Sequence, residues 1–299
     1  MIYDIHHVTT YEYGSIVTFS HCALRLLPQD GPGQKVLATE LSIDPAPKEI
    51  SERACFFGNR VTSMTIETPH QTLVVDASAS VEVNRPRSPD AATTPAWERV
   101  REAAYASASL TRLSPAHFLH PSRYVPRFPP AQAYAQDFFA PGRPVLEAAS
   151  EFMRRMRTDF KYDPCATVVS TPLSQAFAQR SGVCQDFAHI MIAGLRGLGL
   201  PAAYVSGYIR TLPIGGVPVL EGADAMHAWV SLWCGEETGW IGLDPTNALL
   251  ISDDHIMLAR GRDYADISPV AGIISGSGDQ DIDVKVDVVP RQSPASPTG

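Results

Sequence analysis

The sequence predicts an α+β protein in which an N-terminal antiparallel β-sandwich precedes a core of helices packed on an antiparallel β-sheet. Residues 1–85 contain short β-branched or alternating segments separated by turn signals, which is typical of a sandwich. After residue 143 the hydrophobic period changes to that of helices and later to that of strands. We therefore expect a sandwich over 1–85, a Pro-rich connector with short helices over 86–142, the core over 143–290 and a disordered tail over 291–299.

Four segments of the sandwich are expected to be strands. Each is rich in β-branched residues or alternates apolar and polar positions, and turns such as Gly58-Asn59 separate them. The expected strands are 3–11, 38–43, 60–66 and 72–81.

Helices are expected first in the core, and strands follow. Apolar residues recur every three or four positions in 145–158 and again from Cys184 onward. Gly197, Gly199 and Pro201 end the second of these helices, because glycine and proline commonly follow helix C-termini. Shorter helices are expected at 97–108, 134–139 and 172–180, and strands at 202–209, 227–233, 240–244 and 282–289.

Composition and charge argue against two classes of partner. The formal net charge is −8 and the acidic residues are scattered, whereas a nucleic-acid interface needs a basic face. No apolar run approaches the ~18 residues that a membrane-spanning helix requires. We expect neither nucleic acid nor a membrane as a partner.

The five cysteines are odd in number, widely spaced and without a Cys-x-x-Cys pair. This spacing argues against a disulfide framework and against a zinc ribbon, so we expect no metal and no cofactor. The first residues show neither the basic region nor the apolar region of a secretory signal. A reducing cytoplasm is therefore the expected location.

Cys184 opens a predicted helix directly after a glycine-containing turn. A cysteine on an apolar helix face is ordinarily a buried core residue. At a helix start, however, unpaired N–H groups and the positive end of the helix dipole stabilise a thiolate and lower the pKa of the thiol. Gly182 also leaves the preceding backbone open to close approach. Cys184 is therefore the candidate nucleophile, and the other cysteines are interpreted as structural: Cys22, Cys55, Cys165 and Cys234.

His227 and Asp244 are predicted to lie together on a β-hairpin. A two-residue turn centred on Gly235-Glu236 would place glycine where a type II′ turn prefers it. That register pairs His227 directly with Asp244, with Cβ atoms ~5 Å apart. A differently centred loop would break this pairing, but an even shift would keep both side chains on one face of the sheet.

These three residue types suggest nucleophilic catalysis. His227 would take the proton of Cys184 and later protonate a leaving amine, while Asp244 would hold the tautomer of His227 and stabilise its charged form. The backbone N–H of Cys184 is the natural first donor to a developing oxyanion. The second donor stays open, with Tyr162 and Gln179 as candidates.

Three blocks in this order resemble the bacterial transglutaminase-like superfamily, of the cysteine-protease type. They are RSGVCQDFAH at 180–189, DAMHAWV at 224–230 and GWIGLDPTN at 239–247. HVTTYEY at 7–13 with LRLLP at 24–28 resembles the β-rich N-terminal region of many bacterial members, and GRDY at 261–264 resembles a stretch that follows their core. The resemblance implies a papain-like, transglutaminase-like catalytic core with a triad of Cys184, His227 and Asp244.

Other residues are weaker candidates for contact with an oxyanion or a substrate. Gln185 follows the thiol directly, and Trp229 either lines the site or belongs to the core. Arg262 and Tyr264 lie on a segment that forms either a substrate-side loop or a structural ion pair.

The resulting expectation is a cysteine enzyme that cleaves a peptide-like amide in a peptide or protein through a thioester. Hydrolysis, as in an amidase or peptidase, is favoured over transfer to a second amine, as in a protein-glutamine transamidase. A non-catalytic peptide- or protein-binding module on the same fold is the alternative from another class, and its signature would be a missing triad member. A metal-binding redox protein would need clustered cysteine and histidine ligands, which the sequence lacks.

Overall fold

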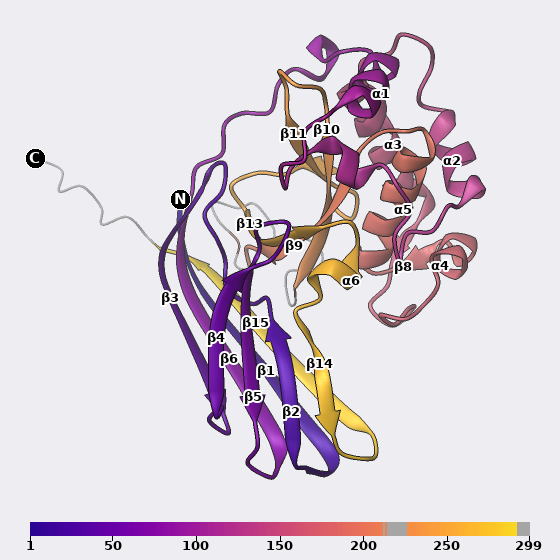
Figure 1. Cartoon of the computed structure of the whole chain (residues 1–299). Coiled ribbons are helices and arrows are strands. Elements are labelled where there is room, and N and C mark those ends of the chain that lie inside the picture. The colour runs from indigo at the N-terminus through magenta and orange to yellow at the C-terminus, as the bar shows by residue number, and fades with distance from the viewer. Residues whose placement is uncertain (212, 214–225, 292–299) are drawn as a thin grey trace, which may run out of the picture.

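The structure is a computed structural model that describes residues 1–211, 213 and 226–291. A β-sandwich occupies one end of the molecule, and a core of helices and strands occupies the other (Figure 1). The predicted α+β class, with antiparallel strands first, is confirmed. Residues 292–299 of the expected disordered tail lie outside the described residues, as do Asp224 and Ala225 of the second sequence block.

The sandwich consists of two four-stranded antiparallel sheets, ordered β15-β1-β6-β3 and β14-β2-β5-β4. Alternate residues of β1 face the interior, among them Tyr3, Ile5 and His7, because side chains on a strand alternate between its two faces. The first sheet contains β1 (Ile2–Val17), β3 (Gln34–Asp44), β6 (His70–Val83) and β15 (Gln280–Pro290). The second contains β2 (Phe19–Leu24), β4 (Glu49–Ala54), β5 (Arg60–Ile66) and β14 (Val270–Ser275).

The C-terminal hairpin completes both sheets of the sandwich. Strand β15 pairs antiparallel with β1, and β14 pairs antiparallel with β2. The expected core over 143–290 included this segment, so the structure differs from that expectation. Alternation along a strand indicates which residues are buried but carries no information about a pairing partner far away in the chain.

Helices cover one side of the core. The connector helices belong to this core, since Trp97, Val100, Ala131 and Ala135 pack in one cluster with residues of the later helices. The helix expected at 134–139 begins earlier because Pro129 favours the first turn of a helix. The helices are α1 (Trp97–Ala106), α2 (Pro129–Gln136), α3 (Val145–Asp159), α4 (Leu173–Gln179), α5 (Cys184–Gly197) and α6 (Tyr264–Ile267).

A five-stranded antiparallel sheet, ordered β12-β11-β10-β9-β13, supports these helices. Alternate residues of β10, namely Ala228, Val230 and Leu232, lie in the same core cluster as Ile192 and Leu195 of α5. Its strands are β9 (Ala202–Ile209), β10 (His227–Trp233), β11 (Trp240–Asp244), β12 (Leu249–Leu250) and β13 (His255–Gly261). A two-stranded parallel pair, β7 (Lys161–Tyr162) and β8 (Ser181–Gly182), lies beside the start of α5.

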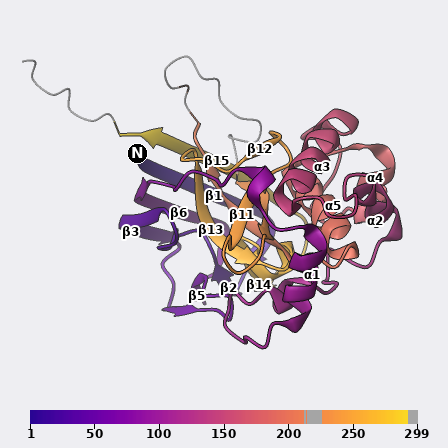
Figure 2. The same cartoon turned by 90° about the horizontal axis from the view of Figure 1, so that it is seen from above.

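The sandwich and the core are joined by a shared hydrophobic cluster. Tyr3 and Val288 of the sandwich pack there with Tyr208 and Ile256 of the core. Polar contacts reinforce the junction: the ring nitrogen Nδ1 of His7 lies 2.7 Å from the hydroxyl of Tyr208. In both views the core sheet lies between the sandwich and helices α2 to α5 (Figures 1 and 2).

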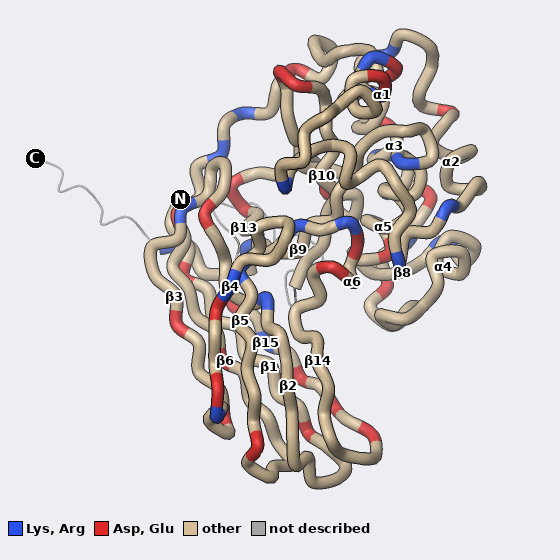
Figure 3. The backbone as a smooth tube through the Cα atoms, viewed as in Figure 1, with Lys and Arg blue, Asp and Glu red and all other residues tan. Residues whose placement is uncertain are grey.

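Charged positions of both signs are distributed over the sandwich and the core (Figure 3). Among the described residues, the helices are too short or too polar to cross a membrane.

Candidate active site

A tight turn presents Cys184 at the first position of α5. Val183 has extended backbone dihedrals, and its N–H donates to the Asp186 carboxylate at 2.9 Å, which satisfies one donor at the helix start. The hydroxyl of Thr167 donates to the same carboxylate oxygen at 2.6 Å. A Cβ added to Gly182 would lie 2.5 Å from this oxygen, so the turn requires glycine at that position.

The thiol of Cys184 is partly buried and free. Its sulfur lies 3.9 Å from the carbonyl oxygen of Met226, the residue before His227. The first hydrogen bonds of α5 run from the N–H groups of Asp186 and Phe187 to the carbonyl of Val183. The N–H of Cys184 precedes these bonds, as expected for an amide that is available to an incoming oxyanion.

The hairpin register differs from the expected one by two residues. Val230 pairs with Leu243 and Trp233 pairs with Trp240, and a longer turn closes with a hydrogen bond from the Cys234 N–H to the Gly239 carbonyl. The direct pairing of His227 with Asp244 was therefore wrong. Because the shift is even, both side chains still lie on one face of the sheet.

Asp244 is completely buried and surrounded by donors. Its Oδ2 accepts from Nε2 of His227 at 2.9 Å and from the side-chain amide of Asn247 at 2.8 Å. Its Oδ1 accepts from the backbone N–H groups of Thr246 at 3.0 Å and of Asn247 at 3.3 Å. A buried carboxylate with this many donors is held ionised and in one orientation.

Electrostatics favour the charged form of both members of this pair. Burial works against charge, but attraction to His227 and the hydrogen bonds to it and to His255 lower the pKa of Asp244 well below its ordinary value. Burial likewise opposes charge on His227, and the Asp244 carboxylate outweighs it, so the pKa of His227 is raised, with a further contribution from Cys184.

The remaining nitrogen of His227 is the one available for chemistry. Because Nε2 is engaged by Asp244, a proton can be exchanged with a neighbouring group only at Nδ1. Nδ1 is buried and has no hydrogen-bond partner among the described residues. The Cys184 sulfur lies against the carbonyl of Met226, the residue before His227, and Cys184 contributes to the raised pKa of this ring.

His255 is a second histidine on Asp244, and it was not predicted from the sequence. Its Nδ1 accepts from the N–H of Ser252 at 3.3 Å, so its proton resides on Nε2 and points at Oδ2 of Asp244, 3.3 Å away. Burial is the main reason that the pKa of His255 is lowered, which keeps the ring neutral. Strand β13, which carries this residue, was not predicted, so no local signal placed His255 near the hairpin.

Three of the weaker candidates hold the loop before α5 in place. Gln179 is exposed, and its amide donates to the backbone carbonyls of Ala166 and Ser181. Gln185 is buried, and its amide donates to the carbonyl of Val169 at 3.1 Å. Tyr162 pairs with Gly182 through the parallel bridge of β7 and β8. The amides of both glutamines are therefore engaged by backbone, whereas Tyr162 lies beside the turn of the thiol.

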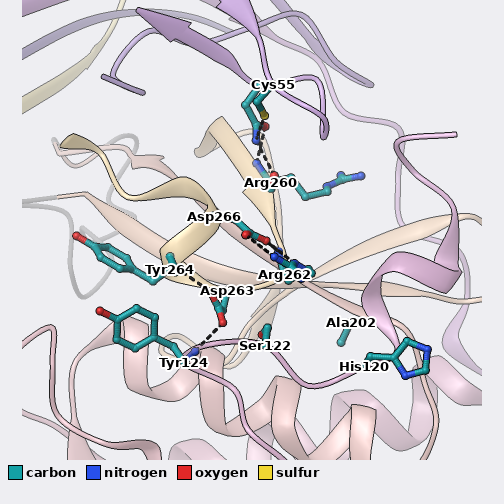
Figure 4. A network of polar contacts seen from close by, with 12 residues as sticks. Cys55, His120, Ser122, Tyr124, Ala202, Arg260, Arg262, Asp263, Tyr264 and Asp266 are labelled. Atoms are coloured by element: carbon teal, nitrogen blue, oxygen red, sulfur yellow. Dashed lines mark hydrogen bonds and ion pairs between the residues drawn. The ribbon is translucent and has the colours of Figure 1, made fainter. Parts of the chain in front are cut away.

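Arg262 and Tyr264 take part in a structural network next to α5 (Figure 4). The guanidinium of Arg262 forms an ion pair with Asp266 at 2.8 Å. Of the two roles expected for this segment, Arg262 therefore takes the structural ion pair. The backbone N–H of Tyr264 donates to Nε2 of His189, whose ring is buried and packs against the rings of Tyr124 and Tyr204. Asp263 accepts from the N–H of Tyr124 at 2.7 Å.

Trp229 is almost completely buried and lies beside the catalytic candidates. Its ring centroid is 6.3 Å from that of His227 and 5.4 Å from that of His255. It therefore forms one wall around the histidine and aspartate pair. Among the described residues, no group of three or more histidine, cysteine, aspartate or glutamate side chains is arranged to hold a metal ion.

A thiol at a helix start, beside a histidine and an aspartate on adjacent strands, defines a papain-like class of site. The model of the transglutaminase-like superfamily matches residues 132–245, and that of the bacterial transglutaminase-like N-terminal region matches residues 3–82. The chain belongs to the transglutaminase-like superfamily and carries this N-terminal region.

Relatives and a solved structure extend the similarity to nearly the whole chain. An uncharacterized protein of Mycobacterium tuberculosis is 38% identical over 300 residues, which cover 98% of this chain and 94% of the relative. Protein-glutamine gamma-glutamyltransferase of Pseudomonas aeruginosa is 36% identical over 96 residues, covering 29% of this chain and 14% of that enzyme. A crystal structure from Cytophaga hutchinsonii, described as a candidate cysteine protease, shares the fold with a TM-score of 0.74 at 22% identity, covering 98% of this chain and 92% of that one.

The turn before Cys184 gives a first prediction. In Gly182→Ala the new methyl group meets the Asp186 carboxylate at 2.5 Å, so we expect a loss of roughly 1–3 kcal/mol in the free energy of unfolding and slower reaction of the thiol. Urea denaturation and thiol labelling measure the two effects. The double variant Gly182→Ala with Asp186→Ala should lose less stability than the sum of the single variants, and strict additivity would contradict the proposed clash.

The buried ion pair predicts a particular dependence of stability on pH. The pKa of His227 is raised in the folded protein, so its contribution to stability is fully present below the ordinary histidine pKa of about 6.5 and is lost as the pH rises toward the folded value. We expect His227→Gln to be most destabilising near about pH 6 and progressively less so by about pH 9. Urea denaturation of both proteins across this range measures the difference, and a constant difference would contradict the prediction.

His255 is predicted to position Asp244 through its Nε2 proton. Replacement by leucine removes a donor to a buried carboxylate, and we expect a loss of roughly 1.5–3 kcal/mol in unfolding free energy. It should also shift the pH dependence of Cys184 labelling, since Asp244 sets the pKa of His227. His255→Gln retains an N–H donor and should restore most of both properties, whereas equal behaviour of the two variants would indicate a packing role alone.

Proposed function

We propose that this protein is a cysteine enzyme that acts on peptide-like amide bonds through a thioester intermediate. The observation that carries the proposal is the buried pair of His227 and Asp244 beside the Cys184 thiol at a helix start. Such an arrangement supports a thiolate next to an imidazolium.

The first half of the reaction forms the thioester. The Cys184 thiolate attacks the carbonyl carbon of the amide, and the carbonyl π electrons move to the oxygen. The N–H of Cys184 donates to this oxyanion. When the carbonyl reforms, the carbon–nitrogen bond breaks, and His227 gives its Nδ1 proton to the departing nitrogen, which leaves as an amine.

The second half regenerates the enzyme. Neutral His227 takes a proton from water at Nδ1 as the water oxygen attacks the thioester carbonyl. The carbon–sulfur bond then breaks, which releases the carboxylic acid and restores the Cys184 thiolate beside protonated His227. If a primary amine takes the place of water, the same steps give a new amide and amount to transamidation.

Asp244 acts in both halves by holding the ring of His227. Its bond to Nε2 keeps Nδ1 directed away from the carboxylate, and its charge stabilises the imidazolium that each half requires. The backbone N–H of Thr246 and the side-chain amide of Asn247 also donate to the Asp244 carboxylate and hold it in one orientation. In this scheme Asp244 keeps its negative charge throughout.

Hydrolysis of a peptide or protein amide is the favoured outcome, and transamidation is the alternative. The Cytophaga hutchinsonii fold relative is described as a candidate cysteine protease, which is consistent with hydrolysis. The partial likeness to the Pseudomonas aeruginosa glutamyltransferase favours transfer to an amine. A non-catalytic binding module is disfavoured because cysteine, histidine and aspartate are all present.

The reactivity of Cys184 is the sharpest prediction of this proposal. The chain offers an internal comparison, since Cys165 is exposed and free while Cys184 is only partly exposed. With an iodoacetamide probe near pH 6, where an ordinary thiol with a pKa near about 8.5 is largely protonated, we expect Cys184 to be labelled faster than Cys165. Peptide mass spectrometry gives both rates in one sample. His227→Ala should abolish the advantage of Cys184, and its persistence would argue against the imidazolium.

The activity itself is tested on a glutaminyl peptide, with and without an added primary amine. Mass spectrometry separates the hydrolysed acid from the amine adduct, and Cys184→Ala should form neither product. Cys165→Ala is the matched control and should keep full activity, because that thiol lies outside the proposed mechanism. Turnover by Cys184→Ala at the wild-type rate would overturn the mechanism.

A further inference from the structure

A second concave site lies between the sandwich, the connector and the core sheet. It is a cavity of about 600 Å³, and Trp229, Trp240 and Arg260 form part of its lining. Loop residues of the sandwich, such as Phe57, and connector residues, such as Arg87, complete it. Its lining does not include Cys184, His227 or Asp244, so it is distinct from the candidate active site.

The charged groups around this cavity are unbalanced. Four guanidinium groups line it, and the single carboxylate of the lining, Asp30, already accepts from the backbone N–H of Val36 at 2.8 Å. Within the described residues, the ion pairs of the protein involve none of the four arginines. These arginines are Arg85, Arg87, Arg112 and Arg260.

The four arginines differ in how far the protein already uses them. The guanidinium of Arg85 donates to the backbone carbonyls of Ser252 and His255, so it has a structural role. The guanidinium of Arg112 packs against Gly58, because a Cβ added to Gly58 would lie only 2.4 Å from it. Arg87 and Arg112 are exposed at the mouth of the cavity. Their charges are therefore free to meet a ligand.

Arg260 is the best-placed of these cations. Its backbone is fixed by Asn59, which donates to its carbonyl at 2.7 Å and accepts from its N–H at 2.8 Å. Its guanidinium lies over the ring of Trp240, 5.6 Å from the centroid. Its Nε is buried without a hydrogen-bond partner among the described residues, and its side chain extends away from the Asp266 carboxylate (Figure 4).

Arg260 is half-buried, and a partly desolvated guanidinium without a counter-charge is costly, which its pKa reflects. Burial is the main cause that lowers the pKa to about 10, and repulsion from Arg85 adds to it. An anion in the cavity would offset both effects, because a guanidinium pairs with a carboxylate or phosphate through charge-assisted hydrogen bonds.

Tryptophans contribute to the rest of the lining, beside polar residues such as Ser231 and Thr238. Trp229 is almost completely buried at its base, and Trp240 is fixed by a hydrogen bond from Nε1 to the carbonyl of Leu113 at 3.1 Å. Tryptophan faces provide large, rigid contact areas for apolar or aromatic groups. The volume falls within the usual range of small-molecule sites, about 300–1,000 Å³.

We propose that this cavity is a binding site for a small organic anion, with a carboxylate or phosphate group held by Arg260 and the arginines of the rim, and an aromatic or apolar body packed on Trp240. The site is separate from the thiol but adjacent to the catalytic pair, since Trp229 also packs beside His227. It is independent of the proposed amide chemistry, because it requires no reaction at Cys184.

Naphthoate and naphthyl phosphate are suitable probes, and the neutral naphthamide serves as a comparison of the same shape. Isothermal titration calorimetry measures binding, and tryptophan fluorescence reports on the cavity, where two of the four tryptophans of the chain lie. We expect at least one of the anions to bind roughly tenfold or more tightly than naphthamide, and binding to weaken as salt screens the charges. Failure of both anions to bind, or equal affinity for naphthamide, would overturn the proposal.

Arg112→Gln tests the charge of the rim without disturbing the buried part of the site. We expect it to weaken binding of the anion by roughly 2- to 5-fold, in line with one exposed charge at a rim. Arg154→Gln, an exposed arginine on α3 outside the cavity, is the matched control and should bind like the wild type. Arg260→Lys keeps the charge but loses the fork-shaped donor set, and it should also weaken binding. Identical affinities for all four proteins would contradict the site.

Discussion

The carboxylate of Asp244 is the group on which the geometry of the candidate active site depends. It is completely buried, and such a charge persists in a protein interior only where donors surround it. His227, His255 and Asn247 supply side-chain donors from separate segments of the chain. The hairpin, the turn after β11 and strand β13 must therefore be assembled together before the carboxylate is satisfied, so the fold and the site are coupled.

Much of this site could be predicted because its central residues carry local signals. Cys184 follows a glycine turn at the start of an amphipathic helix, and His227 and Asp244 lie on strands whose bounds agree with the structure. The turn between those strands could not be predicted, since loop length determines the register and several lengths were compatible with the sequence. His227 and Asp244 still share one face of the sheet despite the shifted register, because side chains on a strand alternate with a period of two residues.

The residues that escaped prediction depend on contacts between distant parts of the chain. His255 approaches Asp244 only because β13 pairs with β9, and nothing in the short segment around His255 specifies that partner. Strands β14 and β15 likewise complete sheets that begin at the other end of the sequence. Hydrophobic alternation reports burial of a strand but not its neighbour, so such pairings require the assembled structure.

The arrangement also confines proton transfer to one direction. Nε2 of His227 is committed to a carboxylate that is itself restrained, and Trp229 lies along the ring. Only Nδ1 of His227 remains available for proton exchange, and the thiol presented by the Gly182 turn is its neighbour. The Gly182 turn itself depends on Asp186. The Asp186 carboxylate accepts from the N–H of Val183 and occupies the space that a side chain at Gly182 would need. Two buried carboxylates, one on the helix and one on the sheet, thus determine how thiol and imidazole meet.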